Sequence, residues 1–161
     1  AVAIGRYFGV EDTQICHALS SYVPQNNRSQ LVQTESNTLI VDAYNANPTS
    51  MMAALLNFRQ MEAEHKVAIL GAMKELGEGS REEHQKVVDF LNECQFERVI
   101  LVGPEFTGLS DSFEHYENVK EVEAMLAAHP VQHCCVLIKG SNRVNLQLVC
   151  KKYYFFANSP Y

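Results

Sequence analysis

Residues 38–56, TLIVDAYNANPTSMMAALL, constrain the fold most, because they combine an apolar strand, a polar turn and a helix. The strand ends on Asp42, and Asn47 precedes Pro48 as a good N-cap. Proline suits the first helical position, since its φ is already helical and its missing N–H would have no partner there. The sequence therefore predicts a carboxylate and two amides at the carboxyl end of a strand, where open α/β sheets bind ligands.

Short apolar runs without polar alternation recur along the chain. They occupy residues 66–70, 98–102 and 135–138 and are separated by segments with helical spacing. Such strands are typical of a mostly parallel sheet that is covered on both faces. Residues 30–34 and 38–41 flank a turn-rich tripeptide and are predicted to form a hairpin. The expected fold class is α/β: a three-layer, Rossmann-like, mostly parallel sheet with helices on both faces and an N-terminal hairpin.

Caps and apolar spacing predict where the helices lie. The helix that starts at Pro48 carries an apolar stripe at Met51, Leu55, Phe58 and Met61. Residues 80–83, SREE, have the form of a capping box ahead of a helix with Val87, Val88, Leu91 and Cys94 facing inward. Asn118 is predicted to cap a helix bearing Val119, Val122 and Leu126. Ser141 or Asn142 is predicted to begin a last helix.

The composition excludes several functional classes. The 161 residues carry a net charge of -6 without a basic run, which argues against nucleic acid or an anionic membrane as partner. No apolar run approaches the ~20 residues that cross a bilayer, and the start lacks the features of a signal peptide. The five scattered cysteines form no C-x-x-C pair and the histidines show no metal-binding spacing, so a reduced, cytoplasmic protein without a metal site is expected.

Three motifs carry a resemblance to a known family. Residues 42–55 are similar to the DxYNANPxSMxAAL signature of the Mur ligases, in the branch that adds D-Ala-D-Ala to UDP-N-acetylmuramoyl-tripeptide in peptidoglycan synthesis. Residues 71–77 resemble the family's GDMxELG, with Ala72 in place of the aspartate, and residues 139–141 resemble its KGS. The resemblance implies an ATP-dependent amide ligase, in which ATP converts a carboxylate to an acyl phosphate that the dipeptide amine attacks.

The resemblance also implies a division of the chain. Residues 1–22 are similar to the end of the family's central ATPase domain, and residues 23–161 to its C-terminal domain. The sequence has no G-x-x-x-x-G-K-[ST] phosphate loop. In the family, that loop and most of the Mg²⁺ site belong to the central domain. We therefore expect the chain to be inactive alone, to contain no catalytic residue, and to work with its own central and N-terminal domains.

The matched positions have expected roles toward ATP. Arg28 and Asp42 would hold the ribose and nearby phosphate, because a carboxylate accepts from both ribose hydroxyls and a guanidinium offers several donors. Tyr44, Asn45 and Asn47 would line the adenine side. The plain alternatives are a solvated linker arginine for Arg28 and a strand-end acid that bonds its own turn for Asp42.

Other matched positions have expected roles toward the D-Ala-D-Ala carboxylate. Lys139, Gly140 and Ser141 would bind it at a helix N-terminus, which favours anions. Lys74 is a further candidate, with an ordinary surface lysine as its alternative. Residues 142–145 depart from the family's continuation, RSMxME, so no contact is predicted beyond Ser141.

Two alternatives remain open at this point. One is another Mur ligase or a folylpolyglutamate synthetase, against which the YNANP run and KGS argue. The other is a non-catalytic α/β binding module of the flavodoxin type. His84 is predicted to have a structural or solvated role.

Overall fold

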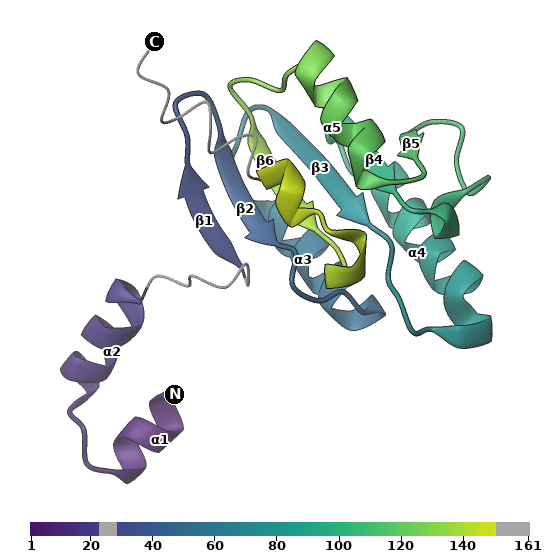
Figure 1. Cartoon of the computed structure of the whole chain (residues 1–161). Helices are drawn as coiled ribbons and strands as arrows, with labels where there is room; N and C mark the ends of the chain where they lie inside the picture. The colour runs from purple at the N-terminus through teal and green to yellow at the C-terminus, as the bar shows by residue number, and fades with distance from the viewer. Residues whose placement is uncertain (23–28, 151–161) are drawn as a thin grey trace.

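A six-stranded sheet forms the centre of the computed structural model, which describes residues 1–22 and 29–150 (Figure 1). The strands are β1 (Gln30–Gln33), β2 (Thr38–Asp42), β3 (Lys66–Gly71), β4 (Arg98–Val102), β5 (Glu114–Tyr116) and β6 (Cys135–Lys139). Their order is β1-β2-β6-β3-β4-β5. Only β1 and β2 pair antiparallel among the described strands. The predicted mostly parallel sheet and N-terminal hairpin are confirmed, whereas β5 is too short to show a pattern in the sequence.

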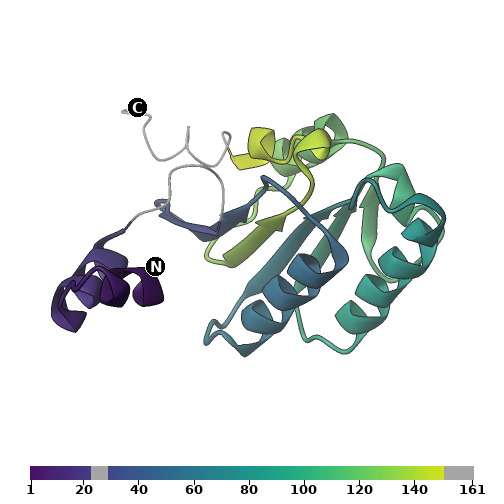
Figure 2. The same ribbon diagram turned by 90° about the horizontal axis from the view of Figure 1, so that it is seen from below.

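Helices cover both faces of the sheet, which confirms the three layers. One face carries α3 (Pro48–Gln60) and α4 (Ser80–Asn92), and the other carries α5 (Val119–Ala128) and the segment after β6 (Figure 2). Cys134 and Cys135 belong to the two opposite cores, as expected for neighbours at a strand end.

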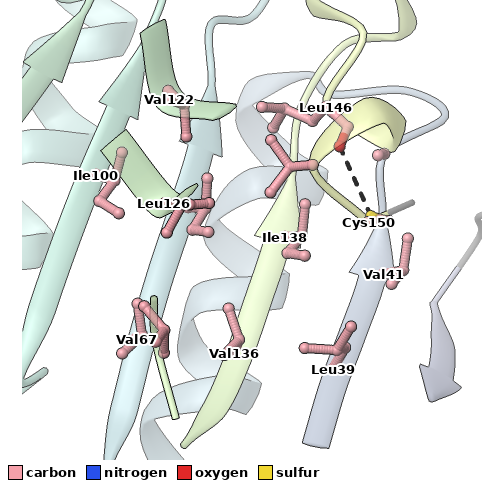
Figure 3. Packing of buried hydrophobic residues seen from close by; sticks show 14 of the residues in the cluster. Leu39, Val41, Val67, Ile100, Val122, Leu126, Val136, Ile138, Leu146 and Cys150 are labelled. Atoms are coloured by element: carbon pink, nitrogen blue, oxygen red, sulfur yellow. Dashed lines mark hydrogen bonds between the residues drawn. The ribbon is translucent and has the colours of Figure 1, made fainter. Parts of the chain in front are cut away.

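Each face buries its own apolar core. On the α5 side, residues of β2 and β6 form one cluster with residues of α5 and of the segment after β6. Figure 3 labels among them Leu39, Val41, Val136, Ile138, Val122, Leu126, Leu146 and Cys150. On the other side, α3 and α4 bury Met51, Leu55, Phe58, Val87, Val88 and Leu91. Full burial of one such side chain stabilises by roughly 1.5–3 kcal/mol, so these two cores hold the layers together.

The predicted start of α3 is confirmed. The Asn47 side chain accepts a hydrogen bond from the Ser50 N–H at 2.8 Å, and the Asn47 N–H donates to Ser50 Oγ at 3.1 Å. Pro48 occupies the first turn. The apolar stripe is shorter than predicted, because Met61 is the C-cap residue and is exposed.

Two helix starts differ from the prediction. The capping box at residues 80–83 is wrong, because the 3₁₀ turn η1 (Gly77–Gly79) leads directly into α4 and gives Ser80 helical dihedrals. Its hydroxyl therefore makes no cap hydrogen bond. After β6, Ser141 caps only the 3₁₀ turn η3 (Asn142–Val144), and α-helical geometry resumes at residues 147–150.

The N-terminal residues form α1 (Val2–Tyr7) and α2 (Asp12–Ser21), which pack on each other. Ile15 is the buried apolar side chain of this pair and lies against Gly5. Arg6 donates two hydrogen bonds of 2.8 Å to the Asp12 carboxylate. Neither these helices nor any other in the described ranges is long and apolar enough to cross a membrane.

Candidate functional site at the carboxyl edge of the sheet

The parallel strands bring the predicted motifs to one edge. Asp42 at the end of β2 lies opposite Lys139 at the end of β6, and Leu70 of β3 lies opposite Lys139 on its other side. The loops that carry the three family motifs therefore leave the sheet next to one another. Ligands of open α/β sheets bind at this edge.

An ion pair joins two of these motifs. Lys139 Nζ lies 2.6 Å from Asp42 Oδ2 and donates a second hydrogen bond of 3.2 Å to the Asn45 carbonyl oxygen. The lysine side chain is 1% exposed and the aspartate side chain 20% exposed. The ammonium is turned inward onto the protein's own carboxylate. The predicted contact of Lys139 with a dipeptide carboxylate stays a prediction.

The turn between Asp42 and α3 presents polar groups to solvent. Tyr44 and Asn45 are exposed, while Ala43 and Ala46 are buried beneath them. The Asn47 side chain is exposed but engaged as the α3 cap. Tyr44 and Asn45 are therefore accessible to a ligand, and Asn47 shapes the turn.

The predicted dipeptide residues lie on two neighbouring loops. Ser141 is buried, and its hydroxyl accepts a 3.4 Å hydrogen bond from the Arg143 N–H. Lys74 forms an ion pair with Glu105 in the loop after β4. Burial raises the pKa of Glu105, but hydrogen bonds from Lys74 and from its own backbone lower the pKa by more. The pKa of Glu105 therefore lies below its usual value.

A concavity lies beside Lys74. It is an open hollow of about 450 Å³, and its lining includes three basic residues, Lys74, Lys120 and Arg143, and the acidic Glu117. Ala72, at the position of the family's aspartate, is fully buried and donates its N–H to the Val102 carbonyl at 2.8 Å. That position therefore faces the core and offers nothing to a ligand.

Two glycines allow β3 and β6 to end close together. A Cβ on Gly140 would lie 2.9 Å from Gly71 Cα and 2.9 Å from Leu146 Cδ1. Real Cβ atoms essentially never approach backbone so closely. The KGS motif thus needs its glycine for strand packing, whatever it binds.

Replacing Gly140 with alanine should destabilise the chain by about 1–3 kcal/mol, the usual cost of overpacking. The matched control is Gly79→Ala, because a Cβ there meets nothing within 4 Å and φ is −74°. Urea unfolding of both variants checks this. Equal stability of the two would mean that the ends of β3 and β6 can separate.

His84 is a buried residue behind the site, which confirms a structural role and excludes the solvated one. Its Nε2 accepts a hydrogen bond from the Met73 N–H at 3.0 Å, and its Nδ1 lies 2.7 Å from the Ser80 carbonyl oxygen. The ring edge packs on Phe106 with centroids 4.8 Å apart. Burial lowers the pKa of His84. The histidine therefore ties the loop that carries Lys74 to α4 and to the loop after β4.

The remaining predictions concern Arg28 and a metal site. Arg28 lies outside the described residues. In the described ranges, no three His, Cys, Asp or Glu side chains gather in a way that could hold a metal ion.

Residues 27–142 match the family model described as "Mur ligase, glutamate ligase domain", which covers most of the chain. The chain belongs to the Mur ligase family. The UDP-N-acetylmuramoyl-tripeptide–D-alanyl-D-alanine ligase of Rickettsia prowazekii is 31% identical over 132 residues, which are 78% of this chain and 29% of that protein. The chain spans about a third of the length of such curated relatives.

Solved structures agree with this family. A MurF of Acinetobacter baumannii is 27% identical, with a TM-score of 0.77 over 94% of this chain and 35% of that chain. MurF of Thermotoga maritima in complex with ADP shares the fold, with a TM-score of 0.79 at 24% identity over 97% of this chain and 36% of that chain. A folylpolyglutamate synthase of Yersinia pestis shares the fold at 15% identity and a lower TM-score of 0.61, covering 89% of this chain and 34% of that one.

Proposed function

We propose that this chain is the C-terminal part of a cytoplasmic, ATP-dependent ligase that adds D-Ala-D-Ala to UDP-N-acetylmuramoyl-tripeptide in peptidoglycan synthesis. The observation that carries the proposal is the turn after β2, where Asp42 is held at the carboxyl edge beside exposed Tyr44 and Asn45. The relatives named for this activity and the family match support it.

In this proposal, the turn after β2 recognises the nucleoside end of ATP. Asp42, whose carboxylate is partly open to solvent, accepts hydrogen bonds from the ribose hydroxyls, and Arg28 assists at the nearby phosphate. Tyr44 and Asn45 line the adenine side, with Asn47 behind them as the helix cap. Bound ATP supplies the phosphoryl group that activates the substrate carboxylate.

The dipeptide would bind at the next loops of the same edge. Gly140, Ser141 and Lys74 are the proposed contacts of its carboxylate, and the cavity beside Lys74 has further cations in its lining. Lys139 was predicted with this group, but its inward pairing supports a different role. As the resemblance to the family implies, Mg²⁺ would be held mainly by the central domain of the ligase.

We also propose that residues 1–22 belong to the preceding ATPase domain. The support is apolar surface that α1, α2 and their ends leave exposed, at Val2, Ile4, Tyr7, Phe8, Val10, Leu19 and Tyr22. Seven exposed large apolar side chains within 22 residues are typical of a surface that packs against another part of a protein. The preceding part of the same ligase would cover it.

The test is a ligation assay with ATP, D-Ala-D-Ala and UDP-N-acetylmuramoyl-tripeptide. The longer ligase that contains this chain should form the pentapeptide product with ADP and phosphate. The 161-residue chain alone should form none, because it has no phosphate loop. Ligation by the isolated chain would overturn the domain assignment, and a longer ligase that extends folates instead would overturn the substrate assignment.

A further inference from the structure

We propose that Lys139 is a positioning residue, which holds the Asp42 carboxylate and the turn of residues 43–47 in place for the nucleotide. This inference rests on the nucleotide role proposed for Asp42. It assigns to the lysine of the KGS motif a part in the ATP side of the site, whereas its neighbours Gly140 and Ser141 are proposed contacts of the dipeptide.

The Lys139 side chain is buried although it carries a charge. It is 1% exposed. A buried ammonium is costly unless it is paired and hydrogen-bonded. Within residues 1–22 and 29–150, Lys139 Nζ donates to Asp42 Oδ2 and to the Asn45 carbonyl, which belong to the end of β2 and the turn that follows. The cost of burying the charge is thus offset by contacts that restrain this one segment.

The Asp42 carboxylate is hydrogen-bonded through both oxygens and is partly exposed. Oδ2 is occupied by Lys139, and Oδ1 accepts a 3.3 Å hydrogen bond from the Ser29 N–H. The side chain remains 20% exposed. Lys139 therefore contacts the carboxylate from the buried side. Each carboxylate oxygen can accept a further hydrogen bond, so the exposed part of the group can still bind a ligand.

Lys139 also restrains the turn of residues 43–47. Lys139 belongs to β6, which pairs with β2 on one side and with β3 on the other. Its backbone is therefore held by the sheet, and its side chain is buried. From there it bonds the Asn45 carbonyl, two residues before the Asn47 cap of α3. A turn ordered before binding loses less entropy when the ligand arrives, which favours affinity.

The kinetic test uses Lys139→Met in the longer ligase, since methionine keeps similar length without the charge. We expect the Michaelis constant for ATP to rise about tenfold or more, and that for D-Ala-D-Ala to change less than about twofold, on the scale of one charge-assisted hydrogen bond. Preference for ATP over 2′,3′-dideoxy-ATP should fall, because the carboxylate that reads the ribose hydroxyls is no longer oriented. A merely structural lysine would leave that preference intact.

The matched control is Lys66→Met. Lys66 is also the terminal residue of a parallel strand, and its ammonium also bonds a backbone carbonyl, that of Arg59, but it lies at the opposite edge of the sheet. In Lys66→Met, the Michaelis constant for ATP and the preference for ATP over 2′,3′-dideoxy-ATP should match those of the parent. A raised D-Ala-D-Ala constant with an unchanged ATP constant in Lys139→Met would overturn the inference and restore the dipeptide role.

A structural measurement separates this inference from the proposed function. Crystal structures of the 161-residue chain and its Lys139→Met variant should show the Asp42 carboxylate rotated and the Asn45 carbonyl released in the variant. Superposable positions of Asp42 and residues 43–47 would overturn the inference even if the parent proves to be the proposed ligase. If the parent shows no ligation, the proposed function fails. The two crystal structures would still show whether Lys139 holds Asp42 and the turn of residues 43–47 in place. Should the methionine variant not fold, Lys139→Leu, which also removes the donor, replaces it under the same criteria.

Discussion

Replacing Asp42 with alanine should raise the Michaelis constant for ATP by roughly 10- to 100-fold in the longer ligase, and change that for D-Ala-D-Ala by less than about twofold. The reason is the loss of hydrogen bonds from the ribose to a charged acceptor, worth about 1.5–3 kcal/mol, where 1.4 kcal/mol is a factor of ten. Steady-state kinetics with each substrate varied in turn, the others saturating, measures both constants.

The alanine variant also leaves the buried Lys139 ammonium without its carboxylate, so it should be less stable than the parent. Kinetics are therefore compared at a temperature where circular dichroism shows both proteins folded. Asp89→Ala, which removes an exposed aspartate on α4 that accepts a hydrogen bond from Gln85, is the control and should change neither Michaelis constant. An equal rise of both constants for Asp42→Ala would make Asp42 structural.

The sequence predicts best what neighbouring residues decide. The cap of α3 depends on Asn47, Pro48 and Ser50, which are adjacent, and the structure confirms it. The same local reasoning is wrong at Ser80, because the preceding 3₁₀ turn gives this residue helical dihedrals. Ser80 is therefore the first residue of α4 and not its N-cap. The hydroxyl instead lies 3.4 Å from His84 Nδ1. Local patterns thus predict an element well and its first residue less well.

The sequence could not predict which motifs meet. Asp42 and Lys139 are 97 positions apart, and their contact depends on β6 inserting between β2 and β3. Periodicity indicates that strands are buried and parallel, but it carries no strand order. The family motifs therefore predict a binding role for both residues, but toward different ligands. Only the strand order shows that they form one ion pair.

His84→Ala should have the largest effect on stability, destabilising the chain by about 3–5 kcal/mol at pH 7.5, the range for removing a buried ring together with its hydrogen bonds. The substitution leaves a cavity beside Phe106 and removes the acceptor of the buried Met73 N–H. Urea unfolding of the 161-residue chain measures the loss. A loss under about 1 kcal/mol would mean that the loop after β3 does not depend on the histidine.

The same residue should make stability depend on pH. Burial lowers the pKa of His84 below its ordinary 6.5, outweighing the Ser80 carbonyl and the acids Glu105 and Glu83, which raise it, while Lys74 lowers it further. The unfolded chain therefore takes up a proton at a pH where the folded chain does not. The contribution of His84 is complete above about pH 6.5 and is lost as pH falls from there through the folded-state pKa.

His84→Gln isolates this contribution, because glutamine can still accept the Met73 N–H but does not titrate. Between pH 7.5 and 5 its free energy of unfolding should fall less steeply than the parent's, whereas His17→Gln, an exposed position on α2, should follow the parent curve. Parallel curves for parent and His84→Gln would show that the buried imidazole takes up its proton without opening the loop. The Met73 N–H would then have to find another acceptor, and the loop that presents Lys74 would be held by its ion pair with Glu105 instead.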